Sequence, residues 1–474
     1  MVFSSGLFLL YFFPVFLILY FVTPWKYKNY LALAASLLFY GWGAPRFIFI
    51  VGLSIIIDFF ITRIMSDSDG MKRKVFLSLS VILNIGLLLY FKYANFFIEN
   101  VNDLLADLGF SRFDWIRVAL PIGISFFTFQ KLSYSIDVFK KMHKSLSKMS
   151  NYALYIILFP QLIAGPIVRF HEIADQIVDR RKQDTIDNKL IGFFRFVIGL
   201  SKKVLIANVL GAEVDRIFAL GEMELSTPLA WFGVLAYSFQ IYFDFSGYSD
   251  MAIGIGRMLG FVFPENFNNP YISRNITEFW RRWHITLGRW MRDYLFIPLG
   301  GSRVKTRRRL FFNLWLVFLI SGLWHGAAWN FVIWGGFHGL FLVLDRIFLI
   351  KFTERIGKIP SIFLTYFITL IGWVLFRAES FSHALTYLGK MFNTDYRDKG
   401  LELGNDIWYM LLIAILFSFF GMINGVESWQ NRMLNEKYKT KSAIIMSFVI
   451  IFLFILSVAS ISSSGFNPFI YFRF

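Results

Sequence analysis

Apolar runs long enough to cross a lipid bilayer recur along this 474-residue chain and constrain its fold more than any other feature. A spanning helix needs about 20 apolar residues, and backbone inside a bilayer must satisfy its own hydrogen bonds. We therefore expect an all-α polytopic membrane protein with about ten to twelve spans. The first run lacks a basic n-region and a small-residue cleavage site, which predicts a retained helix and not a signal peptide. The runs cover residues 6–24, 31–62, 75–98, 190–211, 228–248, 310–349, 361–377, 407–425 and 442–462.

Two segments are apolar enough for the membrane but are interrupted by Pro and Gly, namely residues 120–130 and 158–169. Non-helical backbone at membrane depth has to be buried in protein or line a cavity, so we expect both segments to be re-entrant. The most polar long stretch, residues 244–301, is expected to lie in the membrane interface and to dip into the protein. Because neither a repeat nor a linker divides the chain, we expect one membrane domain over residues 1–474, with an aromatic C-terminal tail at residues 465–474.

The basic residues behind the formal net charge of +17 lie in short loops between the apolar runs. Such loops are typical of the cytoplasmic side of a membrane protein and attract anionic lipid. We therefore expect membrane lipids, and not nucleic acid, as the partner of this charge, with a specific anionic ligand as the alternative. The basic clusters lie at residues 72–74, 140–148, 180–182 and 303–309.

Cysteine is absent, so the chain can carry no disulfide, no thiolate metal site and no acyl thioester of its own. The sequence also lacks a phosphate-binding loop, an H-E-x-x-H zinc motif and a G-x-S-x-G nucleophile elbow. ATP-driven transport, zinc proteolysis and serine-hydrolase chemistry are therefore unsupported, and we expect no metal site and no bound cofactor. The chemistry that remains is histidine acting as a general base on a hydroxyl group.

An ionisable side chain inside a spanning apolar run is costly and is by default a candidate functional residue. His325 is such a residue. The positions one helical turn away are Ser321, Gly322, Ala328 and Trp329, of which three are small. A histidine with these neighbours either packs tightly against another helix or faces a cavity. The pattern alone leaves both a catalytic or ligand-binding role and an idle structural role open.

The other histidines outside the polar stretch are weaker candidates. His338 follows His325 by thirteen residues, which is about 220° around an ideal helix, so one straight helix could not present both to one site. The two glycines just before His338 could change that geometry. His143, His171 and His383 lie among polar or charged residues in expected loops, and we expect no catalytic role for them.

Residues 278–293 have the periodicity of one amphipathic helix. Bulky residues at spacings of three and four predict a continuous seam along it, formed by Trp280, Trp283, Leu287, Trp290 and Tyr294. His284 lies on the adjacent stripe, where Gly288, one turn beyond it, would leave room beside the imidazole. The alternative is an interfacial helix whose tryptophan and arginine side chains only anchor it to lipid headgroups.

Several blocks in a fixed order carry a resemblance that covers nearly the whole chain. The chain resembles the membrane-bound O-acyltransferases (MBOAT), and within them the bacterial branch that O-acetylates extracytoplasmic polysaccharides such as alginate. Any one block alone would be a weak signal, whereas the ordered set is specific. The blocks are Pro121–Gln130, Phe159–Pro166, Asp244–Asp250, Phe279–His284, Arg292–Gly301 and Gly322–Gly326.

This resemblance implies a ring of tilted helices, with re-entrant and interfacial helices, around a central tunnel. A cytoplasmic donor entrance and an outer acceptor entrance would meet at His325, which matches the family's catalytic histidine. His284 matches a second active-site position, which is Asn or Asp in some eukaryotic branches. The chain would be an acyltransferase of the bacterial inner membrane, with acetyl-CoA or another acyl thioester as donor substrate. Its partners would be an extracytoplasmic acetyltransferase and a polysaccharide acceptor.

In the mechanism that follows, His325 takes the proton from an acceptor hydroxyl as the oxygen attacks the thioester carbonyl. His284 would orient the acceptor or stabilise the oxyanion. The residues expected to bind substrate around these two histidines are Trp324, Trp329, Arg281, Arg282, Gly288 and Ser321.

The C-terminal segment Asn467–Phe474 is aromatic and carries one hydroxyl group, on Tyr471. It resembles aromatic tail motifs that relay acyl groups through a tyrosine in related bacterial wall-acylation systems. The resemblance implies that Tyr471 inserts toward His325, accepts the acyl group as an ester and passes it to an extracytoplasmic transferase. An aromatic anchor at the membrane interface is the alternative.

Two other functions remain open at this stage. A lipid O-acyltransferase would need a deep apolar tunnel for a long-chain donor. A non-enzymatic carrier, flippase or scaffold of a polysaccharide-export complex would not need His325 and would spread polar residues over several helices. In this chain the ionisable groups concentrate at residues 244–301 and at two histidines, which favours an enzyme.

Overall fold

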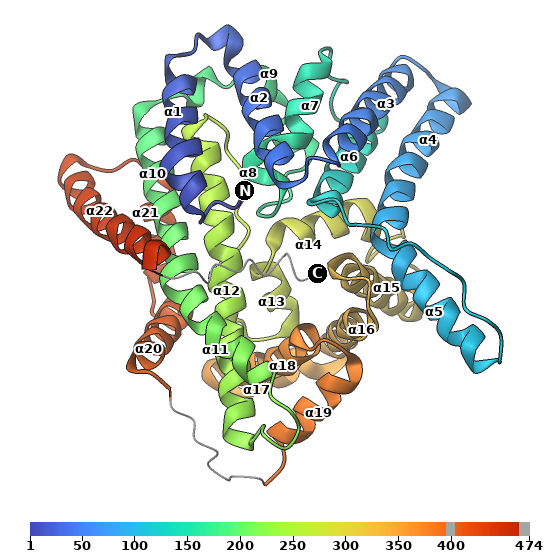
Figure 1. Cartoon of the computed structure of the whole chain (residues 1–474), viewed down its shortest axis with the longest axis vertical. Coiled ribbons are helices and arrows are strands. Elements are labelled where there is room, and N and C mark those ends of the chain that lie inside the picture. Colours follow the sequence, from blue (N-terminus) through green and yellow to red (C-terminus); the bar gives the residue numbers. More distant parts are fainter. Residues whose placement is uncertain (395–402, 464–474) are drawn as a thin grey trace. The chain divides into compact units, whose positions relative to one another are not determined.

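The computed structural model describes residues 1–394 and 403–463, and all regular structure within these ranges is helical (Figure 1). The expected all-α fold is therefore confirmed. The described residues divide into two compact units, and the predicted single domain over residues 1–474 stays a prediction. Six described helices are long and apolar enough to cross a membrane: Ile48–Ser66, Gly70–Asp107, Trp329–Ile356, Lys358–Arg377, Asn405–Met422 and Thr440–Ser463.

The ten to twelve expected spans correspond only in part to these six helices. The run at residues 6–24 forms an apolar helix over Phe8–Val22 only, which is shorter than a full span. The run at residues 228–248 lies in α12 (Thr227–Met258), which is 32 residues long but carries Asp244 and Asp250. The run at residues 310–349 is a hairpin of two helices.

The first unit comprises residues 7–184 and 259–264, together with Met1. Its helices α3 and α4 pair with one another, and α6 packs against both (Figure 1). The helices of this unit are α1 (Phe13–Val22), α2 (Trp25–Gly43), α3 (Ile48–Ser66), α4 (Gly70–Leu88), α5 (Ala94–Asp107), α6 (Ile124–Phe139), α7 (Met149–Ile157), α8 (Phe159–Leu162) and α9 (Phe170–Val178).

A polar network is buried inside this apolar unit. Asp58 of α3 accepts hydrogen bonds from Ser80 at 2.6 Å and Asn84 at 2.9 Å, both on α4, and from Tyr152 of α7. Lys131 of α6 is buried and attracts the same carboxylate electrostatically. A buried carboxylate is stable only with such partners. The network therefore fixes the register of four helices.

Two basic residues that were expected only to mark cytoplasmic loops are buried in this unit. Arg73 donates to two carbonyl oxygens at the end of α6, at 2.7 and 3.0 Å. Arg180 donates to the carbonyl of Leu259 at 2.9 Å and to the hydroxyl of Tyr20 at 2.7 Å. These guanidinium groups hold the unit together, whatever their effect on membrane topology.

The two segments expected to be re-entrant also lie in the first unit. In residues 120–130, Gly123 adopts a left-handed conformation with φ of 79° immediately before α6. A Cβ there would lie 2.6 Å from the carbonyl oxygen of Leu162, so only glycine fits. Residues 158–169 form the single turn α8 followed by irregular chain, and all of them are buried. The burial is what such backbone needs, and re-entry into the membrane stays a prediction.

The described residues of the second unit are 185–258, 265–394 and 403–463, together with residues 2–6. Its described helices are α10 (Ile186–Ser201), α11 (Asn208–Phe218), α12 (Thr227–Met258), α13 (Ile276–Arg282), α14 (Ile285–Met291), α15 (Arg307–His325), α16 (Trp329–Leu344), α17 (Ile350–Ile356), α18 (Lys358–Arg377), α19 (Phe381–Met391), α20 (Asn405–Phe419), α21 (Val426–Asn435) and α22 (Thr440–Ser463).

Helices α10 and α12 are in close contact because glycines meet where they pack (Figure 1). A Cβ added to Gly247 would lie 2.6 Å from the carbonyl oxygen of Gly199, and one added to Gly192 would lie 2.6 Å from that of Gly254. Small residues that let two backbones approach in this way are typical of helix contacts in membranes.

Ion pairs reinforce the same helix contact. Lys203 pairs with Asp244 at 2.8 Å, and both side chains are about 2% exposed. Asp250 pairs with Arg195 at 2.9 Å and with Lys202 at 2.7 Å. Asp244 and Asp250, at the start of the stretch expected to lie in the interface and dip into the protein, lie within the buried helix α12 and serve helix packing, and the position of this stretch at the interface stays a prediction.

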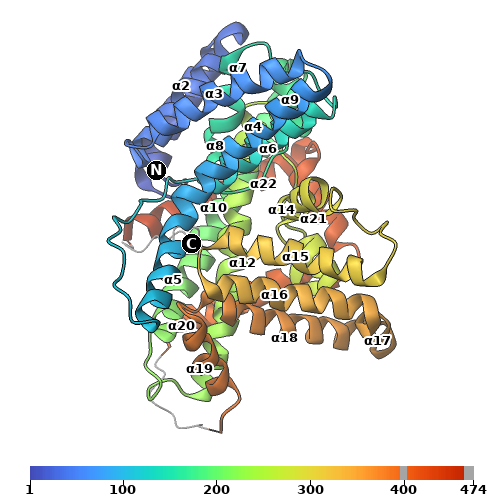
Figure 2. The ribbon, with the colours of Figure 1, turned by 90° about the vertical axis from the view of Figure 1, so that its right-hand side faces the viewer.

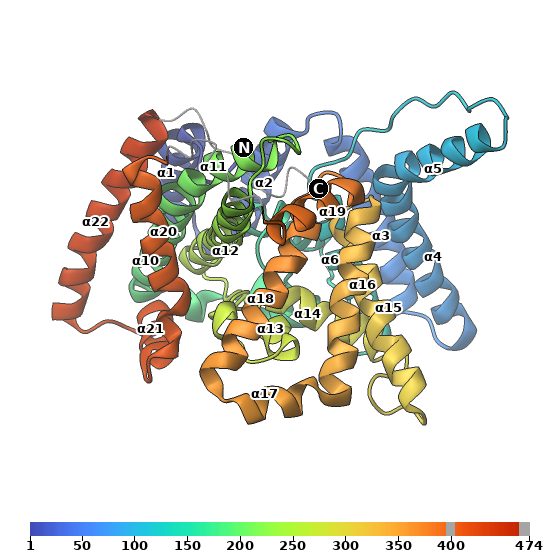
Figure 3. The same ribbon diagram turned by 90° about the horizontal axis from the view of Figure 1, so that it is seen from below.

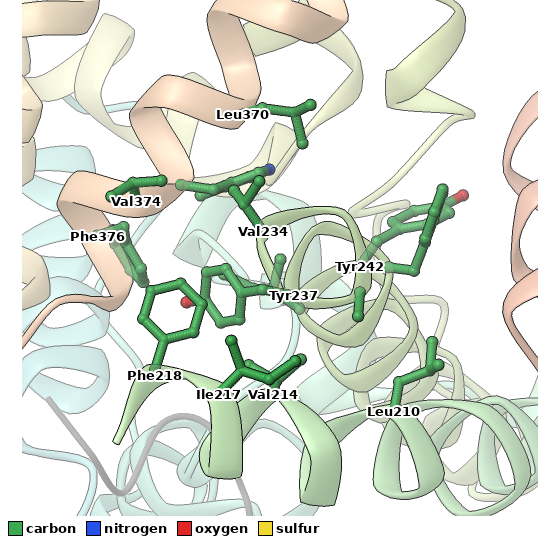
Figure 4. Packing of buried hydrophobic residues seen from close by; sticks show 14 of the residues in the cluster. Leu210, Val214, Ile217, Phe218, Val234, Tyr237, Tyr242, Leu370, Val374 and Phe376 are labelled. Carbon is green, nitrogen blue, oxygen red and sulfur yellow. The ribbon is translucent and has the colours of Figure 1, made fainter. Parts of the chain in front are cut away.

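Helices α15, α16 and α18 lie in successive layers (Figure 2), and α17 connects α16 to α18 (Figure 3). The main apolar core of the unit joins α18 to α11 and α12 (Figure 4). Its members include Leu210, Val214, Ile217 and Phe218 from α11, Val234, Tyr237 and Tyr242 from α12, and Leu370, Val374 and Phe376 from α18. Phe376 extends this core to the side chain of His325.

Candidate active site

His325 is the last residue of α15, and the chain turns back after it into α16. The two helices pack closely because a Cβ on Gly322 would clash with the carbonyl oxygen of Phe331, and one on Gly335 with that of Phe318. The small residues around His325 therefore serve tight packing against another helix, which is one of the two expected alternatives. This packing fixes where the imidazole lies.

Three aromatic rings surround the His325 imidazole, which is 8% exposed. The ring centroids of Trp324, Trp334 and Phe376 lie 5.0, 5.1 and 5.2 Å from that of His325, at interplanar angles of 79°, 84° and 78°. Such a cage limits access of water to the imidazole.

The helix is interrupted at His284, so the predicted continuous helix over residues 278–293 is wrong. α13 ends at Arg282 and α14 begins at Ile285, and His284 between them has φ of 43° and ψ of 53°. This left-handed conformation is uncommon for a residue with a side chain. It places the imidazole at the N-terminus of α14, where the aromatic seam expected along one helix is interrupted.

His284 is held by an asparagine from a distant part of the chain. Its Nδ1 lies 3.0 Å from Oδ1 of Asn266, and the N–H of Ile285 donates to the carbonyl oxygen of Asn266 at 2.9 Å. The ring of Phe245 packs edge-on, 4.7 Å away. His284 is 1% exposed, and burial lowers the pKa of its imidazole well below the usual range. The ring is therefore neutral at physiological pH.

The structure brings the two predicted catalytic histidines together. The ring centroids of His284 and His325 are 6.5 Å apart, and Trp324 contacts both rings, at 6.1 and 5.0 Å. Hydrogen bonds from a ring nitrogen span about 2.7–3.2 Å, so two neighbouring polar groups of one small substrate can reach both imidazoles. The neutral His284 imidazole and the His325 imidazole next to it, in an apolar surrounding, suit proton transfer to and from a hydroxyl group.

A third histidine, His338, lies beside this pair and was given little weight from the sequence. Its ring is 1% exposed and lies 5.0 Å from Trp334 and 4.9 Å from Trp280. Trp334 thus contacts both His338 and His325. No residue in the described part of the chain hydrogen-bonds Nδ1 of His338.

The objection to His338 from helical geometry fails because the helix is not continuous. The break lies at residues 326–328, between α15 and α16. The glycines expected to change the geometry, Gly335 and Gly336, lie inside α16. A Cβ on Gly335 would clash with α15, so this glycine allows the hairpin to close. The pairing of small residues in both helices was the available signal for such a hairpin.

Three of the residues expected to bind substrate lie at the histidine pair. Trp324 contacts both imidazoles, and Ser321 is buried one turn before His325. Gly288 donates its backbone N–H to the carbonyl oxygen of His284 at 3.1 Å. A Cβ on Gly288 would lie 3.5 Å from the carbonyl oxygen of Trp280, which is an ordinary van der Waals contact. Packing would therefore tolerate a small side chain at this position.

The other residues expected to bind substrate are placed differently. Trp329 is 56% exposed at the start of α16, and Arg281 is exposed on α13. Arg282 pairs with Glu278 at 3.0 Å and with Glu427 of α21 at 2.5 Å, so it links helices.

Tyr471 lies outside the described residues. Within residues 1–394 and 403–463, no three His, Asp or Glu side chains are grouped as ligands of a metal ion.

Six described helices of spanning length mark a multi-pass membrane protein, and the buried pair of histidines is its candidate active site. Residues 34–375 match the membrane-bound O-acyltransferase (MBOAT) family. The chain is 36% identical to the probable alginate O-acetylase AlgI of Pseudomonas aeruginosa and 38% identical to that of Azotobacter vinelandii, over all of each chain. It is also 36% identical to the peptidoglycan O-acetyltransferase of Helicobacter pylori, over 100% of this chain and 98% of that one. The chain therefore belongs to the membrane-bound O-acyltransferase family and is an acyltransferase.

Proposed function

We propose that this enzyme transfers an acetyl group from a cytoplasmic thioester, acetyl-CoA in the simplest case, to a polysaccharide on the outer side of the bacterial inner membrane. The observation that carries the proposal is the pair of buried imidazoles, His284 and His325, whose ring centroids are 6.5 Å apart. Burying two polar imidazoles among aromatic rings costs free energy. A pair of histidines that served only packing would not offset this cost, so the pair supports a chemical role.

In the proposed reaction, a hydroxyl oxygen of the acceptor attacks the thioester carbonyl while His325 takes the hydroxyl proton. The new C–O bond forms, the C–S bond breaks, and the departing thiolate receives the proton from the His325 imidazolium. Trp324 and Trp334 contact the base at near-perpendicular angles and enclose it in an apolar surrounding where the transient positive charge is held close to the departing thiolate. The low dielectric of the cage strengthens this interaction.

Exposed basic residues support a phosphorylated donor such as acetyl-CoA. Arg281, Arg289 and Arg292 are exposed on and beside α13 and α14, and residues 303–309 add five further exposed basic side chains. The first of these segments includes His284, which lies between α13 and α14, and the second leads into α15, which ends at His325. A concentration of positive charge attracts phosphate groups and raises their local concentration.

The acceptor class is proposed from the relatives, whose names specify alginate and peptidoglycan. Both are polysaccharides of the cell envelope, and both offer hydroxyl groups on sugar rings. An extracytoplasmic acetyltransferase would be the partner that receives the group if transfer proceeds in two steps.

Fractionation of the labelled products tests this function. Inverted membrane vesicles containing the chain would be incubated with acetyl-labelled acetyl-CoA, which then meets their cytoplasmic face, and extracted into lipid, protein and carbohydrate fractions. We expect label in the carbohydrate fraction, or in the protein fraction when the acceptor is absent. Label confined to lipid would identify a lipid O-acyltransferase instead. Vesicles that accumulate acetyl-CoA without transferring the label would identify a carrier.

We further propose that Tyr471 in the C-terminal tail carries the acetyl group as an ester during the reaction. Its phenol is the one hydroxyl in the segment Asn467–Phe474. Mass analysis of the C-terminal peptide after incubation with acetyl-CoA is expected to find an added acetyl group on Tyr471 in the unaltered chain and none in Tyr471→Phe. The relay would be contradicted by a Tyr471→Phe enzyme with full activity. It would also be contradicted by a wild-type C-terminal peptide that carries no acetyl group when the reaction is stopped during turnover. In either case the tail would be an aromatic anchor at the membrane interface.

A further inference from the structure

The side-chain amide of Asn266 is oriented by groups whose hydrogen-bonding roles are fixed. The backbone N–H of Thr286 donates to Oδ1 of Asn266 at 3.4 Å, and the Thr286 hydroxyl donates to the same oxygen at 2.8 Å. On its other side, Nδ2 of Asn266 donates to the hydroxyl of Ser249 in α12 at 2.9 Å. A backbone N–H can only donate, so the amide oxygen, and not the nitrogen, has to face Thr286 and His284.

This orientation determines which nitrogen of His284 carries the proton. Nδ1 of His284 lies 3.0 Å from the same amide oxygen, which can only accept. In a neutral imidazole one nitrogen carries the hydrogen and the other accepts. Nδ1 of His284 must therefore be the donor, and Nε2 the acceptor.

We propose that Asn266 is a positioning residue that holds His284 in the Nδ1–H tautomer, so that Nε2 presents a lone pair to the acceptor substrate. The presentation of Nε2 to an acceptor rests on the proposed acyl transfer. The tautomer decides between the two roles considered for His284. A nitrogen without a hydrogen cannot donate to an oxyanion, so His284 orients the acceptor and does not stabilise the oxyanion.

The tautomer also constrains the acceptor. The reacting hydroxyl has one proton, which passes to His325, so the hydrogen bond to Nε2 of His284 comes from a different donor on the same substrate. A neighbouring hydroxyl of a sugar ring meets this requirement.

The segment that carries Asn266 is anchored firmly enough to set a tautomer. Around the break between α13 and α14, Ile285 N–H donates to the carbonyl of Asn266, and Asn268 N–H donates to the carbonyl of Arg282, both at 2.9 Å. The preceding residue, Glu265, pairs with Arg195 of α10 at 2.5 Å. Outer partners of this kind fix ring orientation and protonation in other histidine sites.

Nitrogen NMR of the intact protein, labelled with ¹⁵N-histidine in lipid nanodiscs, tests the proposal. The His284→Ala spectrum identifies the two His284 signals by their loss. We expect a protonated-type signal for Nδ1 and an unprotonated-type signal for Nε2 in wild type. Asn266→Asp should keep this tautomer, because the carboxylate still accepts, whereas Asn266→Leu should lose it. A wild-type ring protonated at Nε2, or an Asn266→Leu ring that keeps the wild-type tautomer, would overturn the assignment.

Activity gives a second readout that a purely structural role would not move. A carboxylate beside Nδ1 favours the charged imidazole and so raises the pKa of His284. The acidic limb of the pH–rate profile of Asn266→Asp should therefore move to higher pH, while Asn266→Leu should lose about 10–100-fold in kcat. Asn313→Leu is the matched control: it removes a buried amide that donates to the carbonyl of Leu299 at 3.2 Å and should leave the His284 signals unchanged. The NMR result stands apart from acetyl transfer, so failure of the proposed function and failure of the tautomer assignment are distinguishable.

Discussion

Replacing His325 by alanine is expected to lower acetyl transfer by about 10²–10⁴-fold, which is the usual contribution of a positioned general base. The imidazole is 8% exposed and enclosed by Trp324, Trp334 and Phe376, so bulk water cannot easily substitute for it. Without the base, the acceptor hydroxyl attacks with its proton still attached. The measurement is the initial rate of label transfer from acetyl-CoA in vesicles that contain equal amounts of folded enzyme.

Other histidines of the chain supply the controls for this experiment. His383→Ala removes a partly exposed imidazole at the start of α19, and its rate should match wild type. His284→Ala should be slowed less than His325→Ala, because in the proposed mechanism His284 orients the acceptor while His325 transfers the proton. A His325→Ala enzyme that keeps more than a tenth of the wild-type rate would remove His325 from the role of base. Equal loss in all three variants would indicate a folding defect.

His325 could be singled out as a candidate from the sequence because its signals are local, and its role as the base stays a prediction. An ionisable residue in an apolar run, three small neighbours one turn away and the short block around it all lie within ten residues. The helical fold follows for the same reason, since apolar length is a property of contiguous residues. The tight contact between α15 and α16 was one of two stated alternatives, and it is the one observed.

The environment of His284 could not be predicted because the deciding residue is distant and the local pattern is misleading. Residues 278–293 have helical periodicity throughout, and no Pro or Asn marks a break. The break is set by tertiary contacts: Asn266 lies 18 residues away and binds His284, Ile285 and Thr286 at once. Tertiary hydrogen bonds of this kind override local propensity.

The partners of the charged block at residues 244–250 could not be predicted either. Its polarity suggested an interfacial segment that dips into the protein, and the structure pairs Asp244 and Asp250 with Lys203, Lys202 and Arg195. Composition cannot distinguish a charge that faces a headgroup from one that faces a countercharge on another helix. The distinction matters for function, because a motif shared within a family can be maintained by packing as well as by chemistry.

Breaking the Lys203–Asp244 pair should therefore destabilise the protein without removing its chemistry. Asp244→Leu leaves the Lys203 ammonium, about 2% exposed, without its carboxylate. Loss of one partner of a buried pair costs about 3–5 kcal/mol. The measurement is the midpoint of thermal unfolding in detergent, together with the rate of acetyl transfer per folded molecule. We expect the midpoint to fall clearly while the rate per folded molecule stays close to wild type.

The double variant Lys203→Met with Asp244→Leu makes this prediction decisive. Replacing a buried ion pair by apolar side chains of similar size is often neutral or stabilising. The double variant should therefore unfold at a temperature closer to the wild-type midpoint than Asp244→Leu does. The matched surface pair, Lys437 with Asp187 at 2.7 Å, has side chains 73% and 45% exposed, and Lys437→Met should change stability by less than about 1 kcal/mol. An Asp244→Leu enzyme that folds with the wild-type midpoint but transfers no acetyl would instead place Asp244 in the chemistry. In that case the double variant could not restore acetyl transfer, because the reacting carboxylate would still be missing.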